Sequence, residues 1–132
     1  MAAYTKRSYP PENVRGWQFI WKELELEWLG VTFIRLGAHE GAGFTHSHER
    51  QEEIYYVLEG SPALRIDGKL VPLRRGDMVR VRAQARRAVG NPSDEEACLL
   101  VAGGMPHDTA PRSGRPSRIG DGIPHKEDKP TW

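Results

Sequence analysis

Apolar and polar residues alternate in short runs along most of the chain, and a turn signal follows nearly every run. In residues 78–81, for example, Val79 and Val81 share one face of an extended chain while Arg80 occupies the other. No apolar repeat with a helical period lasts long enough to predict a long helix. The strands expected from this pattern cover residues 17–22, 26–36, 53–58, 62–66, 69–73, 78–81, 86–89 and 96–102, with one more around His46 and His48.

Turn residues separate these strands and indicate how they connect. Asp67 and Gly68 lie between two alternating runs, and they predict a tight hairpin because both central residues of a type I′ turn need positive φ. Gly30 falls inside the expected strand 26–36, where it predicts an interruption or a bend. Many short strands joined by such turns are typical of an antiparallel β-barrel or a double-sheet jelly roll. The sequence therefore predicts an all-β fold.

The chain of 132 residues is large enough for one domain with its own core. We expect a polar N-terminal arm at residues 1–16, a barrel domain at 17–104 and a Pro/Gly-rich tail at 105–132. The tail is either disordered or an arm that wraps the barrel, with Ile119, Ile123 and Trp132 as its anchors. These two interpretations of the tail stay open.

Charge and composition limit the classes of partner. The 19 basic and 18 acidic residues leave a formal net charge of +1, so the sequence predicts binding neither to nucleic acid nor to an anionic membrane. No segment approaches the length that spans a bilayer, and a cytoplasmic location is the default expectation. Cys98 is the only cysteine, which excludes an intrachain disulfide and a cysteine metal cluster.

The candidate chemistry lies between Gly41 and Gly60. His46 and His48 are two residues apart, so an extended strand turns both imidazoles to the same face of a sheet. Glu53 opens the next expected strand. Two imidazoles and one carboxylate from adjacent strands form a ligand set that suits a divalent transition metal with open coordination positions, such as iron, manganese, nickel or zinc.

At these residues the chain resembles the cupin superfamily, whose first motif is G(X)5HXH(X)3-4E(X)6G. His46, His48, Glu53 and Gly60 fit that motif, and the leading glycine stands one position late, at Gly41. The resemblance covers roughly residues 28–104 and implies a cupin-type β-barrel, or double-stranded β-helix, with the metal site inside. It also implies a homodimer and chemistry of the oxygenase or isomerase kind.

The second cupin motif, G(X)5PXG(X)2H(X)3N, is incomplete. Aligned from Gly76 to Asn91, it has Arg82 at the proline and Arg87 at the histidine that supplies the fourth metal ligand. A guanidinium offers no lone pair, so Arg87 is not a ligand. Three alternatives remain. The first three residues hold a metal alone and Arg87 binds an anionic substrate, or Arg87 replaces the metal, or Arg87 points outward and His107 or His125 fills the position.

Six arginines lie between positions 74 and 87, and they have two interpretations. They form a solvated strand face balanced by acidic residues elsewhere, or they form an anion site at the mouth of the barrel. The candidate substrate-binding residues are Arg87, Arg82 and Tyr55, with Phe44 a further candidate for the cavity wall. Tyr55 shares strand parity with Glu53, so both should point inward, where the hydroxyl of Tyr55 needs a partner such as a ligand.

Two functions from different classes fit these observations. The first is a metal-dependent, oxygenase-like or isomerase-like enzyme that binds a small anionic molecule through the metal and Arg87. The second is a non-catalytic ligand-binding or sensor barrel, without metal, in which Arg87 takes the place of the ion. A purely structural role is the third possibility, and no catalytic residue is assigned.

Overall fold

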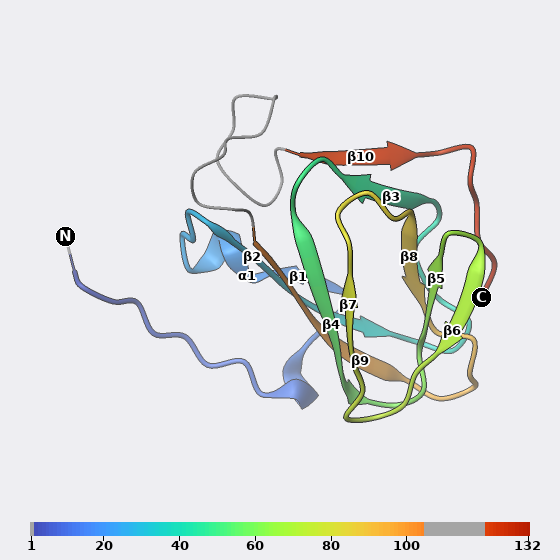
Figure 1. The fold of residues 1–132 in the computed structure, drawn as a ribbon. Helices are drawn as coiled ribbons and strands as arrows, with labels where there is room; N and C mark the ends of the chain where they lie inside the picture. The colour runs from blue at the N-terminus through green and yellow to red at the C-terminus, as the bar shows by residue number, and fades with distance from the viewer. Residues whose placement is uncertain (1, 105–120) are drawn as a thin grey trace.

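The computed structural model describes residues 2–104 and 121–132. Within these residues, ten strands form two five-stranded sheets in which all neighbours are antiparallel (Figure 1). The first sheet has the order β1-β2-β9-β4-β7 and the second has the order β10-β3-β8-β5-β6. The predicted all-β class is confirmed. Among the described residues no helix is long and apolar enough to cross a membrane.

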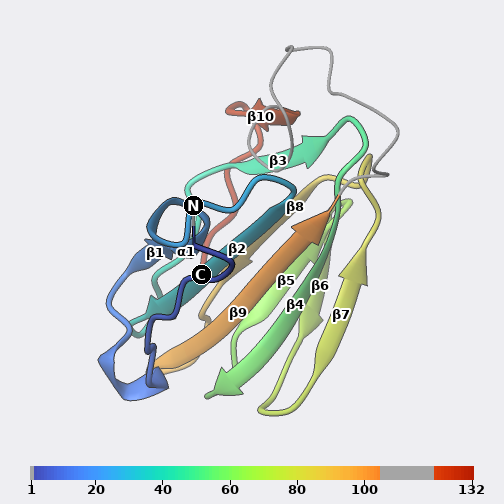
Figure 2. The ribbon, with the colours of Figure 1, turned by 90° about the vertical axis from the view of Figure 1, so that its left-hand side faces the viewer.

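The strands and the two short helical segments have the following bounds: η1 Pro11–Asn13, β1 Trp17–Phe19, α1 Ile20–Glu23, β2 Leu29–Leu36, β3 Thr45–His48, β4 Glu52–Glu59, β5 Ala63–Ile66, β6 Lys69–Pro72, β7 Met78–Val81, β8 Arg87–Gly90, β9 Ala97–Gly104 and β10 Gly122–His125. The long strands β2, β9 and β4 run side by side through the middle of the first sheet (Figure 2).

The apolar core lies between the two sheets, where inward residues from both meet. Ile34, Val57, Leu64 and Leu99 are each at most 1% exposed, and they belong to one cluster that draws on β2, β4, β5 and β9. Ile34 and Leu64 are each followed by a less buried arginine, Arg35 and Arg65, as the two-residue period of a strand predicts. Burial of this apolar surface is the main force that holds the sheets together.

The hairpin between β5 and β6 forms as predicted. Asp67 has a φ of 48° and Gly68 a φ of 80°, the positive values that a type I′ turn needs at both central residues. Glycine adopts such a value without steric cost, and aspartate tolerates it better than most residues do.

Two strand predictions near the N-terminus are wrong in detail. Residues 17–22 form a strand only as far as Phe19, because the chain then turns through α1 and buries Ile20. The expected interruption at Gly30 is absent, since β2 runs through this residue and pairs Gly30 with Gly103 of β9. β9 pairs with every residue of β2, and this pairing keeps the glycine extended despite its weak strand propensity.

The C-terminal end of the chain lies along the barrel. β10 pairs with β3, and the ring of Trp132 rests on the backbone of Gly41 and Gly90, with its Nε1 donating to the carbonyl of Ala42 at 3.0 Å. For residues 121–132 the wrapping interpretation of the tail is thus the correct one. Trp132 is an anchor as expected, Ile123 is 40% exposed and is not one, and Ile119 lies outside the described residues.

Candidate metal centre

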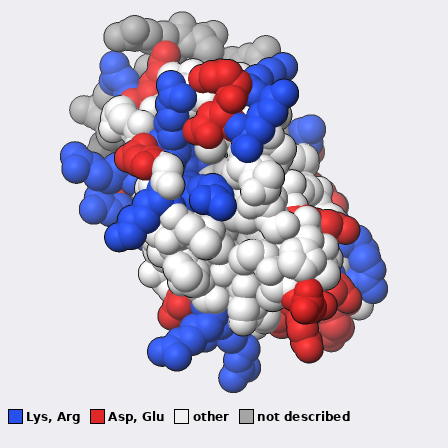
Figure 3. All heavy atoms as spheres, turned by 90° about the vertical axis from the view of Figure 1, so that its right-hand side faces the viewer, with Lys and Arg blue, Asp and Glu red and all other residues white. Residues whose placement is uncertain are grey.

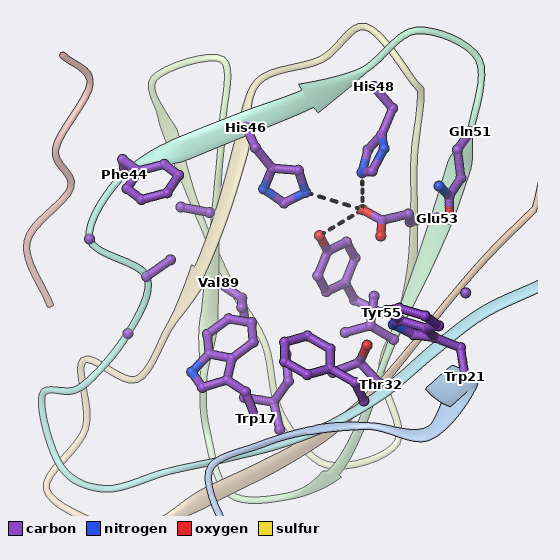
Figure 4. A pocket seen from close by; sticks show the side chains of 18 residues that line it. Trp17, Trp21, Thr32, Phe44, His46, His48, Gln51, Glu53, Tyr55 and Val89 are labelled. Atoms are coloured by element: carbon purple, nitrogen blue, oxygen red, sulfur yellow. Dashed lines mark hydrogen bonds and ion pairs between the residues drawn. The ribbon is translucent and has the colours of Figure 1, made fainter. Parts of the chain in front are cut away.

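His46, His48 and Glu53 meet inside the barrel at the end where β3 crosses above β4 (Figure 4). The Nε2 atoms of His46 and His48 lie 3.7 and 3.4 Å from Oε1 of Glu53. All three ligand atoms lie within 4.8 Å of one another. β3 supplies both imidazoles because its alternate residues share a face, and β4 supplies the carboxylate through the same periodicity.

This geometry is compatible with a bound metal ion. Ligands about 2.1 Å from a metal and at right angles to each other are separated by roughly 3 Å, close to the two His–Glu distances. Nε2 of His48 is buried and has no hydrogen-bond partner among the described residues. A buried polar atom without a partner is costly, and an ion at the centre of the three groups would relieve that cost. The donor set therefore fits a divalent transition metal.

Asp121, just before β10, binds the other nitrogen of His48. Its Oδ1 lies 2.9 Å from Nδ1 of His48 and 3.1 Å from Nε2 of Gln51. Its Oδ2 accepts the backbone N–H groups of Arg50 and Gln51 at 3.0 and 2.8 Å. The carboxylate is completely buried. Because a carboxylate only accepts hydrogen bonds, His48 carries a proton on Nδ1 and turns the lone pair of Nε2 toward the centre in its neutral form.

Arg87 lies beside Glu53 but does not reach the cavity. It is the register partner of His46, so both side chains point to the same face of their sheet. Its Nε donates to Oε1 of Glu53 at 3.2 Å, and its Nη1 donates to the carbonyls of Ala83 and Ala85 at 2.9 and 2.6 Å. The side chain is 0% exposed and Nη2 has no partner among the described residues. The guanidinium thus supports the Glu53 carboxylate from behind.

Tyr55 points inward with Glu53, as its strand parity predicted. Its buried hydroxyl donates to Oε1 of Glu53 at 3.0 Å, so the partner of this hydroxyl is Glu53 and not a ligand. Burial first, and then the charge of Glu53, raise the pKa of Tyr55 well above its ordinary value. The phenol therefore stays protonated and can go on donating.

The charges at the centre balance one another. Burial is the largest influence on Glu53 and would raise its pKa, but His46, His48 and Arg87 together lower that pKa well below the ordinary value. For His48, burial alone would lower the pKa, but Glu53 and Asp121 raise it above its ordinary value. Glu53 is consequently ionised and ready to act as a ligand.

A cavity of about 470 Å³ opens from the three ligand residues. Its lining includes four aromatic side chains, Trp17, Phe19, Trp21 and Phe44. In Figure 4, Trp17 and Trp21 lie on the side of the cavity opposite His46 and His48. Glu53 is the only acidic residue that lines it, and neither lysine nor arginine does so among the described residues. The space in front of the centre is therefore largely apolar.

Arg82 lies away from this cavity. It is exposed and lines a separate surface hollow with Arg50, Glu52 and Arg80. Neighbouring arginines of the same stretch pair with acidic residues at the surface, Arg80 with Glu52 at 3.7 Å and Arg86 with Glu127 at 3.3 Å. On the face drawn in Figure 3, basic and acidic side chains stand near one another around a broad uncharged area. These contacts favour the interpretation of a solvated strand face.

His125, the tail histidine that the structure describes, does not lie at the fourth ligand position. His125 belongs to β10 and its Nε2 lies 2.8 Å from the hydroxyl of Ser47, whose side chain alternates away from those of His46 and His48. His107 lies outside the described residues. Arg87 does not point outward either, so the third of the alternatives raised by the second motif finds no support in His125.

Comparison with known proteins assigns the family. A family model described as a cupin domain matches residues 32–103. The chain belongs to the cupin family. This membership and the two antiparallel sheets confirm the predicted cupin jelly roll. No match was found among curated proteins.

Solved structures of other proteins resemble the chain over most of its length. A cupin protein from Bacteroides fragilis is 28% identical with a TM-score of 0.73, and the alignment covers 83% of this chain and 91% of that one. A cupin-superfamily sugar phosphate isomerase from Silicibacter pomeroyi is 26% identical with a TM-score of 0.61, covering 68% of this chain and 59% of that one. The protein TT1209 from Thermus thermophilus is 25% identical with a TM-score of 0.60, covering 75% and 90%.

Sequence reasoning missed Asp121. The residue is 73 positions from His48 in a segment rich in glycine, proline and charge, where nothing marks one aspartate as buried. It also lies outside the region that the family model matches. Only the pairing of β10 with β3, which the tail composition does not predict, brings it to the site.

Proposed function

We propose that this cupin binds one divalent transition metal ion through His46, His48 and Glu53 and acts on a small molecule held in the adjoining cavity. The proposal rests on the convergence of three ligand atoms within 4.8 Å, one of which is a buried nitrogen with no hydrogen-bond partner in the described part of the chain. Two histidines and one carboxylate leave coordination positions open for a substrate, in contrast to a closed structural site. Iron, manganese, nickel and zinc all suit such ligands.

The metal would supply Lewis acidity toward an oxygen atom of the substrate, or activate dioxygen or water. The residues of the chain hold the arrangement in place. Arg87 and Tyr55 both donate to Oε1 of Glu53, which fixes the carboxylate and leaves Oε2 free of these two contacts. Tyr55 also lines the cavity, and because its only hydroxyl hydrogen is donated to Glu53, its oxygen is left to accept a hydrogen bond from a bound molecule.

The lining of the cavity refines the substrate class. The expectation of an anion clamp at Arg87 and Arg82 loses its support, since neither residue lines the cavity. We infer a substrate with an apolar or aromatic body that lies against Trp17, Phe19 and Phe44. One oxygen-bearing group, such as a carboxylate, a carbonyl or a hydroxyl, would contact the metal. The rest of the substrate would meet no lysine or arginine among the described lining residues.

The relatives allow two reaction types. The similarity to a sugar phosphate isomerase supports isomerase chemistry, and the triad of ligands also suits oxygenase chemistry. A phosphate group, however, has no cationic partner among the described residues of this cavity, so we do not extend the sugar phosphate substrate to this chain. We further expect a cytoplasmic homodimer.

A second candidate function is favoured by the contact between Arg87 and Glu53. The guanidinium already neutralises the carboxylate at 3.2 Å, as an ion would, and its positive charge opposes binding of a divalent cation a few ångströms away. In this alternative the barrel is a metal-free binding or sensor module. Its apolar cavity then recognises a small molecule without catalysis.

Metal analysis of protein purified without chelator separates these functions. The metal hypothesis predicts about one ion per chain, lost in His46→Ala and kept in His39→Ala, a surface histidine whose ring binds Asp94 instead. Arg87→Met removes the competing cation, so metal affinity should rise by about 10-fold or more. A wild-type chain that stays metal-free when loaded with zinc, manganese, nickel or ferrous iron, and an Arg87→Met variant that metal does not stabilise, would leave only the binding module.

A further inference from the structure

The segment that follows residue 120 contributes a buried carboxylate to the metal centre, although it lies outside the region that the family model matches. We propose that Asp121 is a positioning residue for the centre, and that metal binding and the docking of β10 are coupled through it. This inference rests on the proposed function. It adds a role for a part of the chain to which neither motif refers.

The hydrogen bonds of Asp121 reach one of the ligand strands, β3, and the turn that leads into the other, β4. One oxygen binds Nδ1 of His48 on β3, and the other accepts the N–H groups of Arg50 and Gln51, which lie in the turn that leads into β4. The backbone carbonyl of Asp121 accepts a further N–H group, from Glu49. A single residue thus organises the whole connection between the two histidines and Glu53.

The contact with His48 decides which ring nitrogen faces the centre. With the proton held on Nδ1, the lone pair of Nε2 points toward Glu53, where a metal needs it. Carboxylates that bind the outer nitrogen of a histidine ligand orient the ring and raise its basicity, and their removal typically costs about 10- to 100-fold in metal affinity. His48 is only 6% exposed, so water does not replace a lost partner easily.

Coupling to β10 follows from where Asp121 lies. The residue immediately precedes β10, and Gly122, the first residue of that strand, pairs with His48 itself. Undocking β10 would therefore withdraw the carboxylate from the site. Coupling between two such events is reciprocal. If docking of β10 raises the metal affinity by a given factor, metal binding raises the docking equilibrium of β10 by the same factor.

Asp121→Asn and a matched control test this role. An amide has one acceptor oxygen where the carboxylate has two, so Asp121→Asn cannot serve both His48 and the backbone N–H groups. Asp128→Asn is the control, since Asp128 also anchors the C-terminal segment, through Thr45 at 2.8 Å, but does not touch a ligand residue. We expect zinc affinity, measured by competition with a chelating dye, to fall by about 10- to 100-fold in Asp121→Asn and by less than about 3-fold in Asp128→Asn.

Hydrogen exchange measures the coupling directly. In the wild-type chain, added zinc should slow amide exchange in β10, and in Asp121→Asn the slowing should be lost. Equal losses of zinc affinity in the two variants would overturn the proposal, because they would indicate that the segment stabilises the barrel in general. Unchanged affinity in Asp121→Asn, or zinc binding that leaves β10 exchange unaltered in the wild type, would overturn it as well.

A readout without metal keeps the two hypotheses separable. Long-range nitrogen NMR of the metal-free wild-type chain should show the neutral ring of His48 with its proton on Nδ1, and Asp121→Asn should change that tautomer while Asp128→Asn should not. A neutral ring whose single proton is on Nε2 in the wild type would refute the positioning role whether or not metal binds. If the tautomer is as expected but no metal binds, the proposed function and the coupling fail, and Asp121 keeps only its effect on the ring.

Discussion

Two segments flank the region that matches the cupin model, and they serve the site in opposite ways. The N-terminal one brings Trp17, Phe19 and Trp21 to the cavity wall, where a bound molecule would touch them. The C-terminal one brings Asp121 behind His48, where it binds a ligand residue and does not line the cavity. The N-terminal segment determines which molecules fit the cavity, and the C-terminal segment positions a metal ligand. A shared barrel can therefore be adapted by its extensions without changes to its central motif.

We expect the largest effect when the C-terminal segment is undocked at its far end. In Gly90→Ala the added methyl group would collide with the ring of Trp132, which covers Gly90. We expect a loss of about 1–3 kcal/mol of stability from overpacking, with faster proteolysis of residues 121–132 and a drop in zinc affinity of about 10-fold or more. Gly43→Ala is the control, because a methyl group there meets nothing within 4 Å.

Zinc binding that is unaffected in Gly90→Ala, while proteolysis shows the segment released, would contradict the division of roles. The C-terminal segment would then be a covering strand with no effect on the centre.

The N-terminal segment should give the complementary result, with ligand affinity changed and metal affinity kept. Trp17→Ala removes an aromatic wall, and we expect zinc-loaded protein to lose about 10-fold in affinity for 3-phenylpropionate, whose ring needs an apolar surface. Trp28→Ala is the matched control, since Trp28 is 51% exposed and does not line the cavity. Calorimetric titration of both variants measures the difference.

The same titration with glucose 6-phosphate in place of 3-phenylpropionate sharpens the substrate class. Tighter binding of the sugar phosphate, or equal losses in Trp17→Ala and Trp28→Ala, would argue against an apolar substrate body.

The smallest effect concerns pH and the end of the C-terminal segment. His39 binds Asp94 at 2.8 Å and an oxygen of Trp132 at 3.3 Å, and the bond to Asp94 is the main reason that its pKa is raised. A raised folded-state pKa means that the stabilisation is complete below the ordinary value and is lost as pH rises through the raised one. Because the ring is solvent-exposed, we expect only a slight decrease in amide exchange protection near Trp132 as pH rises, measured in protein from which a chelator has removed metal.

His39→Ala should abolish that pH dependence. If the dependence persists in this variant, a group other than His39 holds the end of the segment.

The sequence predicted the barrel and the convergence at its centre because both depend on local periodicity. Alternation places His46 with His48 and Glu53 with Tyr55. β3 and β4 belong to different sheets, and the short connection between them brings the two sets together across the barrel. The same reasoning could not place Arg87, since the motif gives its position but not whether its flexible side chain turns to the cavity or to Glu53. Asp121 could not be found at all, because its burial depends on long-range strand pairing.

The same limits explain the substrate expectation. The arginine-rich stretch at positions 74–87 suggested an anion site, but strand parity sends Arg80 and Arg82 to the surface, where charge is cheap to solvate. The apolar wall came instead from Trp17 and Phe19, which the sequence marked only as strand residues. Which strand faces which part of the cavity is a property of the topology, and no local pattern reports it.

Anomalous diffraction from crystals grown with Mn²⁺ or Zn²⁺ tests the central claim most directly. We expect one strong peak about 2.0–2.3 Å from Nε2 of His46, Nε2 of His48 and a carboxylate oxygen of Glu53. Asp121 should still accept a hydrogen bond from Nδ1 of His48. A map with no peak among these three residues, from protein that was saturated with the ion, would contradict it.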